Sequence, residues 1–179
     1  MYIGVSNSSL MSSSTTTTTR LHEPTYFKAI LLATFVAGTL DITAAIVSFM
    51  LKGGKDPIKI FYFISSGVFG KEMAYGSGGW MALAGLLFHY LIAFLFSLFM
   101  FLIYPWVKSL LKNKILIGVL YGIFVWFIMN KIVVPLSNTP PPAAPPTINS
   151  QIISCLILIF FIGIPITWIV DRYYSKRAV

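Results

Sequence analysis

Charged residues are scarce in this chain of 179 residues: they make up 10% of it, whereas a typical soluble domain has about 25%. Acidic residues are the rarest, with 5 Asp and Glu against 13 Lys and Arg, while hydrophobic residues reach 57%. The mean hydropathy is +0.84. A single core of this size cannot bury so much apolar surface. The composition therefore excludes a disordered chain and a water-soluble globule, and it predicts that lipid solvates part of the surface.

Residues that bind metals, cofactors or nucleic acids are also few. The single cysteine, Cys155, excludes an intramolecular disulfide, and the two histidines provide neither a metal-ligand spacing nor two axial haem ligands within the apolar blocks. The glycine-rich segments lack the preceding strand and Gly-Lys-Ser/Thr ending of a phosphate-binding loop. Basic residues form no stripe with interleaved aromatics, as a nucleic-acid surface requires. We therefore expect no metal, no cofactor, no nucleic-acid partner and no enzymatic activity.

Four long apolar blocks organise the chain. They cover residues 26–51, 80–104, 115–136 and 152–170. Each has roughly 19 to 26 residues, and a helix needs about 20 to cross about 30 Å of hydrocarbon. The strict alternation of a membrane β-barrel is lacking. The sequence predicts an all-α polytopic membrane protein, in which residues 26–171 form a bundle of four transmembrane helices.

The segments between the blocks contain one further helical pattern. Residues 57–68 mix apolar and polar side chains over a length too short to span a bilayer, which predicts an interfacial helix in the first extracytoplasmic loop. Glycine-rich turns are expected around residues 66–71 and 75–79. Pro105 is predicted to end the second span, and Asp171 to close the fourth.

The distribution of Lys and Arg predicts the orientation in the membrane. Residues 1–25 are a polar, low-complexity segment that we expect to be a disordered tail, and residues 172–179 form a basic tail. One side collects eight cationic residues: Arg20, Lys28, Lys108, Lys112, Lys114, Arg172, Lys176 and Arg177. The other side has four, which are Lys52, Lys55, Lys59 and Lys71. The excess predicts that the lipid bilayer is crossed with both termini in the cytoplasm.

Asp41 is the most informative polar residue, because it falls near the middle of the first block. It lies about 15 Å from the outer end of its helix, where an ionised carboxylate costs at least about 2.5–3.5 kcal/mol. His89 in the second block lies at nearly the same depth, about 13–14 Å. We expect the two side chains to face each other, because a carboxylate–imidazole pair can share a proton. Asn130 and Lys131 in the third block are expected to complete this polar centre.

Small residues recur at helical spacing in the same blocks and predict close packing of the spans. The positions are Gly38, Gly85, Gly118 and Gly122. Gly163 followed by Pro165 suggests a kink in the fourth span.

Two interpretations of the polar centre remain open from the sequence. In the first, Asp41 and His89 form a structural lock that holds two helices in register, in a subunit that assembles with itself or with a membrane partner. In the second, they form a proton-responsive or ion-handling site, as intramembrane ionisable residues often do.

The segment from His89 to Pro142 also carries a family resemblance. It has a Phe-rich helix with Pro105 near its end, a short basic loop, the Gly118/Gly122 helix and then Pro135-Leu-Ser-Asn-Thr-Pro-Pro141. These features resemble the YagU-like family of small bacterial inner-membrane proteins. The resemblance covers the second and third spans. It implies a bacterial inner-membrane location and, at most, a link to acid resistance.

Overall fold

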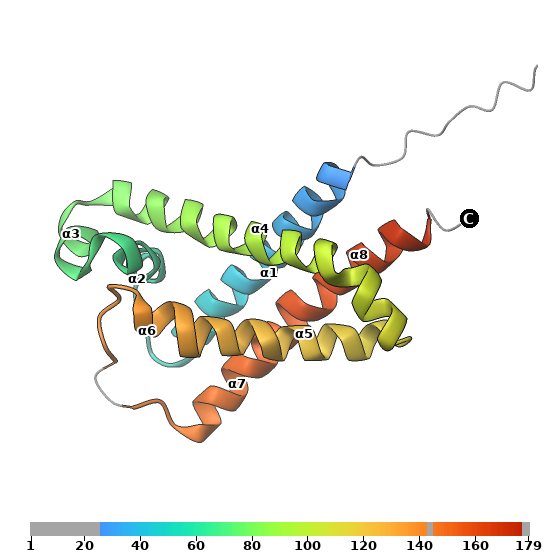
Figure 1. The fold of residues 1–179 in the computed structure, drawn as a ribbon. Coiled ribbons are helices and arrows are strands. Elements are labelled where there is room, and N and C mark those ends of the chain that lie inside the picture. Colours follow the sequence, from blue (N-terminus) through green and yellow to red (C-terminus); the bar gives the residue numbers. More distant parts are fainter. Residues whose placement is uncertain (1–25, 143–144, 177–179) are drawn as a thin grey trace, which may run out of the picture.

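The computed structural model describes residues 26–142 and 145–176, and every regular element within them is a helix. Four helices are long and apolar enough to span a membrane. Two of them are α1 (Tyr26–Leu51) and α4 (Gly79–Leu110). The third joins α5 (Lys114–Ile128), η1 (Met129–Val133) and α6 (Val134–Leu136), and the fourth joins α7 (Ile148–Leu158), η2 (Ile159–Gly163) and α8 (Ile164–Ser175). The predicted all-α polytopic bundle is confirmed (Figure 1).

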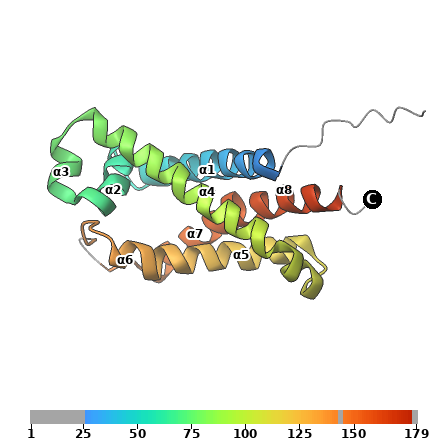
Figure 2. The same cartoon turned by 45° about the horizontal axis from the view of Figure 1, so that its top comes forward.

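Both ends of the described chain lie at one end of the bundle, which we call the terminal end (Figure 2). The ring of Tyr26, which begins α1, packs edge-on against Tyr173 near the end of α8, with 5.8 Å between the ring centroids. The opposite end carries the α1–α4 connection and the segment after Leu136, and we call it the loop end. Since the spans number four, the two ends of the described chain share one side, and that this side is the cytoplasm remains a prediction.

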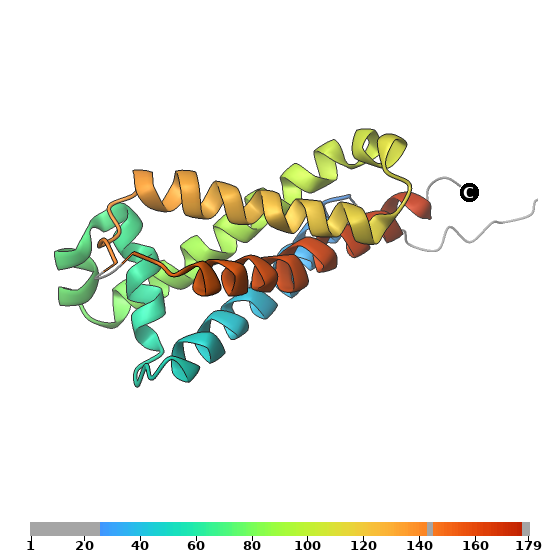
Figure 3. The same cartoon turned by 90° about the horizontal axis from the view of Figure 1, so that it is seen from below.

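A short helix crosses the loop end, as predicted for residues 57–68. Helix α2 (Ile58–Phe69) packs across α4 and reaches the loop after Leu136, where the backbone N–H of Asn138 donates to the carbonyl of Gly67 at 3.0 Å (Figure 3). The expected glycine-rich turns are shorter than predicted. Most of their residues are helical, in α2 and in α3 (Lys71–Gly76), and within residues 66–71 and 75–79 only Gly70 and Gly78 adopt a positive φ.

Pro105 does not end the second span, which corrects the sequence-based expectation. Helix α4 continues through it to Leu110. A proline lacks an N–H, so the carbonyl four residues earlier, that of Phe101, loses its helical donor. The hydroxyl of Tyr174 donates to this carbonyl at 2.9 Å instead. The donor that replaces the missing N–H of Pro105 thus comes from α8, 69 residues after the proline (174 minus 105).

The third and fourth spans each contain a proline that follows a π-helical turn. Turn η1 comes directly before α6, which contains Pro135, and η2 comes directly before α8, which contains Pro165. Widened turns of this kind accommodate carbonyls that a proline leaves without a donor. A π turn therefore lies at the position where Gly163 and Pro165 suggested a kink.

Glycines let two of the spans touch backbone to backbone. A Cβ on Gly122 would overlap the backbone of Ile159, and one on Gly163 would overlap that of Gly118. A Cβ on Gly118 would lie 3.0 Å from the Cα of Ile164. Close approach of this kind is the usual role of small residues between membrane helices. The Gly118/Gly122 seam thus packs α5 against η2 and α8.

The other two predicted seam glycines have different neighbours. Gly38 on α1 faces the ring of Tyr90 on α4, 2.9 Å from the position of a Cβ. Gly85 on α4 faces the backbone of Phe61 in α2. Gly85 therefore allows the short crossing helix α2 to pack closely on α4. The sequence predicted a second membrane span as the partner of Gly85, whereas α2 is too short to be one.

The close-packed core occupies the terminal half of the bundle. Its largest fully buried side chains include Phe101 and Tyr104 of α4 and Ile166 and Val170 of α8. Phe101 contacts the ring of Tyr26 edge-on at 5.3 Å between centroids. Such aromatic pairs contribute about 0.5–1.5 kcal/mol beyond their buried area. The cavities described next lie in the other half.

Candidate functional site

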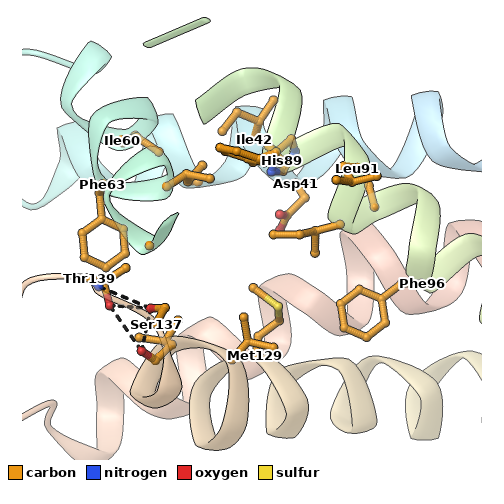
Figure 4. Close-up of a pocket in the computed structure, with 18 of the residues that line it drawn as sticks. Asp41, Ile42, Ile60, Phe63, His89, Leu91, Phe96, Met129, Ser137 and Thr139 are labelled. Carbon is orange, nitrogen blue, oxygen red and sulfur yellow. Dashed lines mark hydrogen bonds between the residues drawn. The ribbon is translucent and has the colours of Figure 1, made fainter. Parts of the chain in front are cut away.

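Asp41 lies in the middle of α1, and its carboxylate is directed into a cavity between the helices (Figure 4). The residue is half-buried. Its carboxylate makes no hydrogen bond or ion pair with any residue of 26–142 or 145–176. The cost of a charge at this depth is therefore not offset by a direct contact within the described chain.

His89 comes from α4 and lines the same cavity. It is 9% exposed, and its Nε2 lies 2.8 Å from the carbonyl oxygen of Gly38. The expected placement of Asp41 and His89 in one region is observed, but the imidazole hydrogen-bonds to the backbone of α1 rather than to the carboxylate. The two side chains are close enough to interact electrostatically without touching.

A cavity of about 520 Å³ lies between α1 and α4 on one side and the third span, formed by α5, η1 and α6, on the other. This volume is within the usual range of small-molecule pockets, about 300–1,000 Å³. Most of its wall is apolar, formed by side chains such as Phe63, Phe88, Phe96, Met129 and Ile162. Asp41 and His89 are polar groups at one side of it, and Ser137 and Thr139 lie at the loop end (Figure 4). Such a wall suits an apolar ligand oriented by a few polar groups.

A second cavity, of about 590 Å³, adjoins the first. The two share five lining residues: Asp41, Ala45, Ile60, Phe63 and Leu158. The second cavity also reaches Lys52 at the end of α1, Lys59 on α2 and Tyr75 on α3. Asp41 therefore lies where the first cavity meets the second, which extends to Lys52 and Lys59.

Asn130 and Lys131 are not brought to this centre. Both are exposed. The amide of Asn130 donates to the carbonyl of Trp126 at 3.0 Å, and the ammonium of Lys131 lies 5.6 Å from the Trp126 ring centroid. Helical geometry explains the difference, because Val125, Met129 and Val133 line the cavity at four-residue spacing. Residues 130 and 131 follow Met129 within the π-helical turn η1, on the side that faces away from this wall, and both are exposed.

A buried aspartate, Asp171, was missed by the sequence reasoning. Asp171, expected at a helix boundary, is 8% exposed within α8, which continues to Ser175. Its Oδ1 accepts from the hydroxyl of Tyr104 at 2.6 Å and from Lys108 at 2.7 Å, and its Oδ2 lies 3.5 Å from Lys114. Tyr104 and Lys108 are four residues apart and so share one face of α4. This spacing was the only sequence signal for the cluster. It does not point to Asp171, which accepts from Lys108 and lies 63 residues beyond it.

Protein-family models, curated proteins and solved structures were compared with the chain, and nothing matches it.

The arrangement around Asp41 restricts the possible chemistry. No three His, Cys, Asp or Glu side chains gather as a metal site would need, within the ranges 26–142 and 145–176. A carboxyl group without a hydrogen-bond partner, in a mostly apolar wall beside an imidazole, is suited to binding and releasing a proton or orienting a bound molecule.

Proposed function

We propose that this integral membrane protein couples proton binding at Asp41 and His89 to the binding or passage of a small, mostly apolar molecule. One observation carries the proposal: the Asp41 carboxylate has no hydrogen-bond or ion-pair partner among the described residues and lies at the junction of two cavities. Intramembrane ionisable groups placed in this way typically mark proton or substrate pathways.

The charged and titratable groups around Asp41 support a pathway toward the loop end. His89 faces it from α4. The second cavity adds Lys52 from α1, Lys59 from α2 and Tyr75 from α3. The described residues of α7 that line this cavity are Ser154, Ile157 and Leu158, which do not titrate near neutral pH. A proton that enters from the loop end would therefore meet Asp41 and His89 as the innermost titratable side chains of these walls.

The decisive measurement is proton flux into liposomes that contain the purified full chain and an internal pH-sensitive dye. We expect Asp41→Asn to reduce the flux at least tenfold, because the amide cannot exchange a proton, while the thermal unfolding temperature stays unchanged. Asp41→Glu retains a carboxyl group and should retain measurable flux. Asp56→Asn is the matched control, since Asp56 is exposed before the start of α2 and an asparagine can also accept its hydrogen bond from the Ile58 N–H. Wild-type flux in Asp41→Asn would overturn the proposal.

A structural role is the second candidate, and hydrogen bonds between α1 and α4 favour it. Besides the contact of His89 with Gly38, the hydroxyls of Thr39 and Tyr90 lie 2.9 Å apart. In this case His89→Ala would lower the unfolding temperature, and Asp41→Asn would leave any flux unchanged. The two measurements on the two variants distinguish the candidates.

We extend the proposal to the biological setting suggested by the sequence. A relation to the YagU-like family would place the chain in a bacterial inner membrane, and a proton-linked cavity would suit a role in acid survival. We propose that bacterial cells expressing the chain survive an acid shock better than cells expressing Asp41→Asn. Equal survival would remove this setting without affecting the liposome result.

Assembly is a further part of the proposal. One bundle of four helices encloses little volume, so we expect a transporting form to be a homo-oligomer or to include a membrane partner. Light scattering of the detergent-solubilised chain, corrected for bound detergent, measures the mass of the assembly directly. A monomer that still supports flux would exclude oligomerisation as a requirement.

A further inference from the structure

The terminal end has a pocket of its own, separate from the Asp41 cavities. It measures about 610 Å³ and lies beside the start of α5 and the end of α8. Its lining residues are Lys114, Trp168, Asp171, Arg172, Ser175 and Lys176. Three cationic side chains and one carboxylate therefore surround it, so the local charge is positive.

The single carboxylate does not satisfy these cations. Asp171 Oδ1 is already bound by Lys108 and Tyr104, and Lys108 alone neutralises one negative charge. Lys114 stays 3.5 Å from Oδ2, which is beyond the usual 2.7–2.9 Å of a charge-assisted hydrogen bond. Within the part of the chain that the structure describes, Arg172 and Lys176 have no hydrogen-bond acceptor or ion-pair partner for their charged groups, and Lys114 has only this long ion pair. Their donors are available to an anion with several oxygen atoms.

The surroundings of the pocket are those of a lipid boundary. Trp168 is 50% exposed, and the Arg172 guanidinium lies 5.6 Å from its ring centroid. Next to Lys114, Ile115 is exposed as well, on a helix of membrane-spanning length. Tryptophan and cationic residues at the end of an apolar surface are typical of the headgroup region. A ligand here would contact cations at one end and apolar side chains at the other.

We propose that this pocket binds the phosphate group of an anionic phospholipid, with Lys114, Arg172 and Lys176 as the cationic ligands and Trp168 against the beginning of the acyl chains. Arginine and lysine donate to phosphate oxygens, and the planar guanidinium can do so through two parallel bonds. The apolar neighbours favour a lipid over a free phosphate ion. This site is independent of the Asp41 proposal, since it shares none of its lining residues with either cavity.

Native mass spectrometry of the purified full chain tests the site by titration with phosphatidylglycerol and, separately, with phosphatidylcholine. We expect the anionic lipid to bind at least tenfold more tightly. The double variant Arg172→Gln/Lys176→Gln should bind it about 30-fold more weakly, because each cation near an anionic surface contributes about 1 kcal/mol. This variant keeps both ion pairs of Asp171, and its unfolding temperature should match that of the wild type.

The control is Lys55→Gln/Lys71→Gln, which removes the same charge from exposed loop-end residues. It should retain wild-type binding of phosphatidylglycerol. Equal weakening in both double variants would show attraction by net charge alone and would overturn the proposal. So would equal affinity for the two lipids. Competition by inorganic phosphate at the concentrations at which the lipid binds would assign the pocket to a free anion and overturn the lipid assignment.

Discussion

Each half of the bundle contains an aspartate, and the two carboxylates have opposite surroundings. In the terminal half, Asp171 lies beside a close-packed aromatic core and is bound by Lys108 and Tyr104, with Lys114 nearby. In the loop half, Asp41 borders two cavities and has no such partner among the described residues. A paired carboxylate holds helices together, whereas an unpaired one at hydrocarbon depth is retained at a cost in stability. We therefore expect substitutions at the paired aspartate to lower stability more than substitutions at the unpaired one.

The largest effect should come from separating the helices that pack through Gly122. In Gly122→Leu, the new side chain would overlap the backbone of Ile159, which cannot move aside as a side chain can. We expect a loss of roughly 3 kcal/mol or more in the free energy of unfolding, measured by denaturation in mixed micelles. Gly79→Leu is the control, since a Cβ there meets no atom within 4 Å. Similar losses in both variants would refute the close crossing.

Removing the charge of Asp171 should have the next largest effect. Asp171→Asn leaves Lys108 and Lys114 without a counter-ion. Breaking a fully buried pair costs about 3–5 kcal/mol, but the Lys108 side chain is 39% exposed, so we expect about 2 kcal/mol. The same unfolding measurement on Asp56→Asn should show a change within about 0.5 kcal/mol. A stable Asp171→Asn protein would mean that solvent screens this cluster.

A smaller loss is expected where Tyr174 replaces the donor that Pro105 lacks. Tyr174→Phe leaves the carbonyl of Phe101 without that hydrogen bond, which should cost about 1 kcal/mol. Tyr62→Phe is the comparison, because the Tyr62 hydroxyl makes no hydrogen bond within the described residues. Equal unfolding temperatures for the two variants would contradict the role given to Tyr174.

The smallest change in stability, a gain rather than a loss, should come from replacing the unpaired aspartate, Asp41. Asp41→Asn removes a potential charge that the described chain does not compensate, so we expect the free energy of unfolding to stay the same or rise by up to about 1 kcal/mol. The contrast with Asp171→Asn is the sharpest test of the comparison, since the substitution is the same. If both variants lose about 2 kcal/mol, the two halves do not differ in the way proposed.

Much of the fold follows from local patterns. Blocks such as 26–51 have the length of a membrane span, and the α1 bounds match it residue for residue. The short helix near 57–68 is likewise set by its own composition. The end of α4 was not predictable, because Pro105 is a helix breaker in isolation, whereas here Tyr174 of α8 donates to the Phe101 carbonyl that the proline leaves without a donor.

The candidate site was predictable in part. Asp41 and His89 stand out as intramembrane polar residues, and both line the 520 Å³ cavity. Asn130 and Lys131 were included for their polarity alone, although the helical phase of Met129 and Val133 turns them outward. The partners of Asp171 lie on α4 and at the start of α5, which no local pattern connects to residue 171.

The amino-acid sequence by itself determined that this chain lives in lipid as four helices, because the length and hydropathy of a segment decide whether it crosses a bilayer. Only the tertiary structure decided which carboxylate is neutralised and which is left facing a cavity. Coulombic and hydrogen-bond partners act over a few ångströms in space, and for both aspartates the neighbouring side chains come from helices far away along the chain.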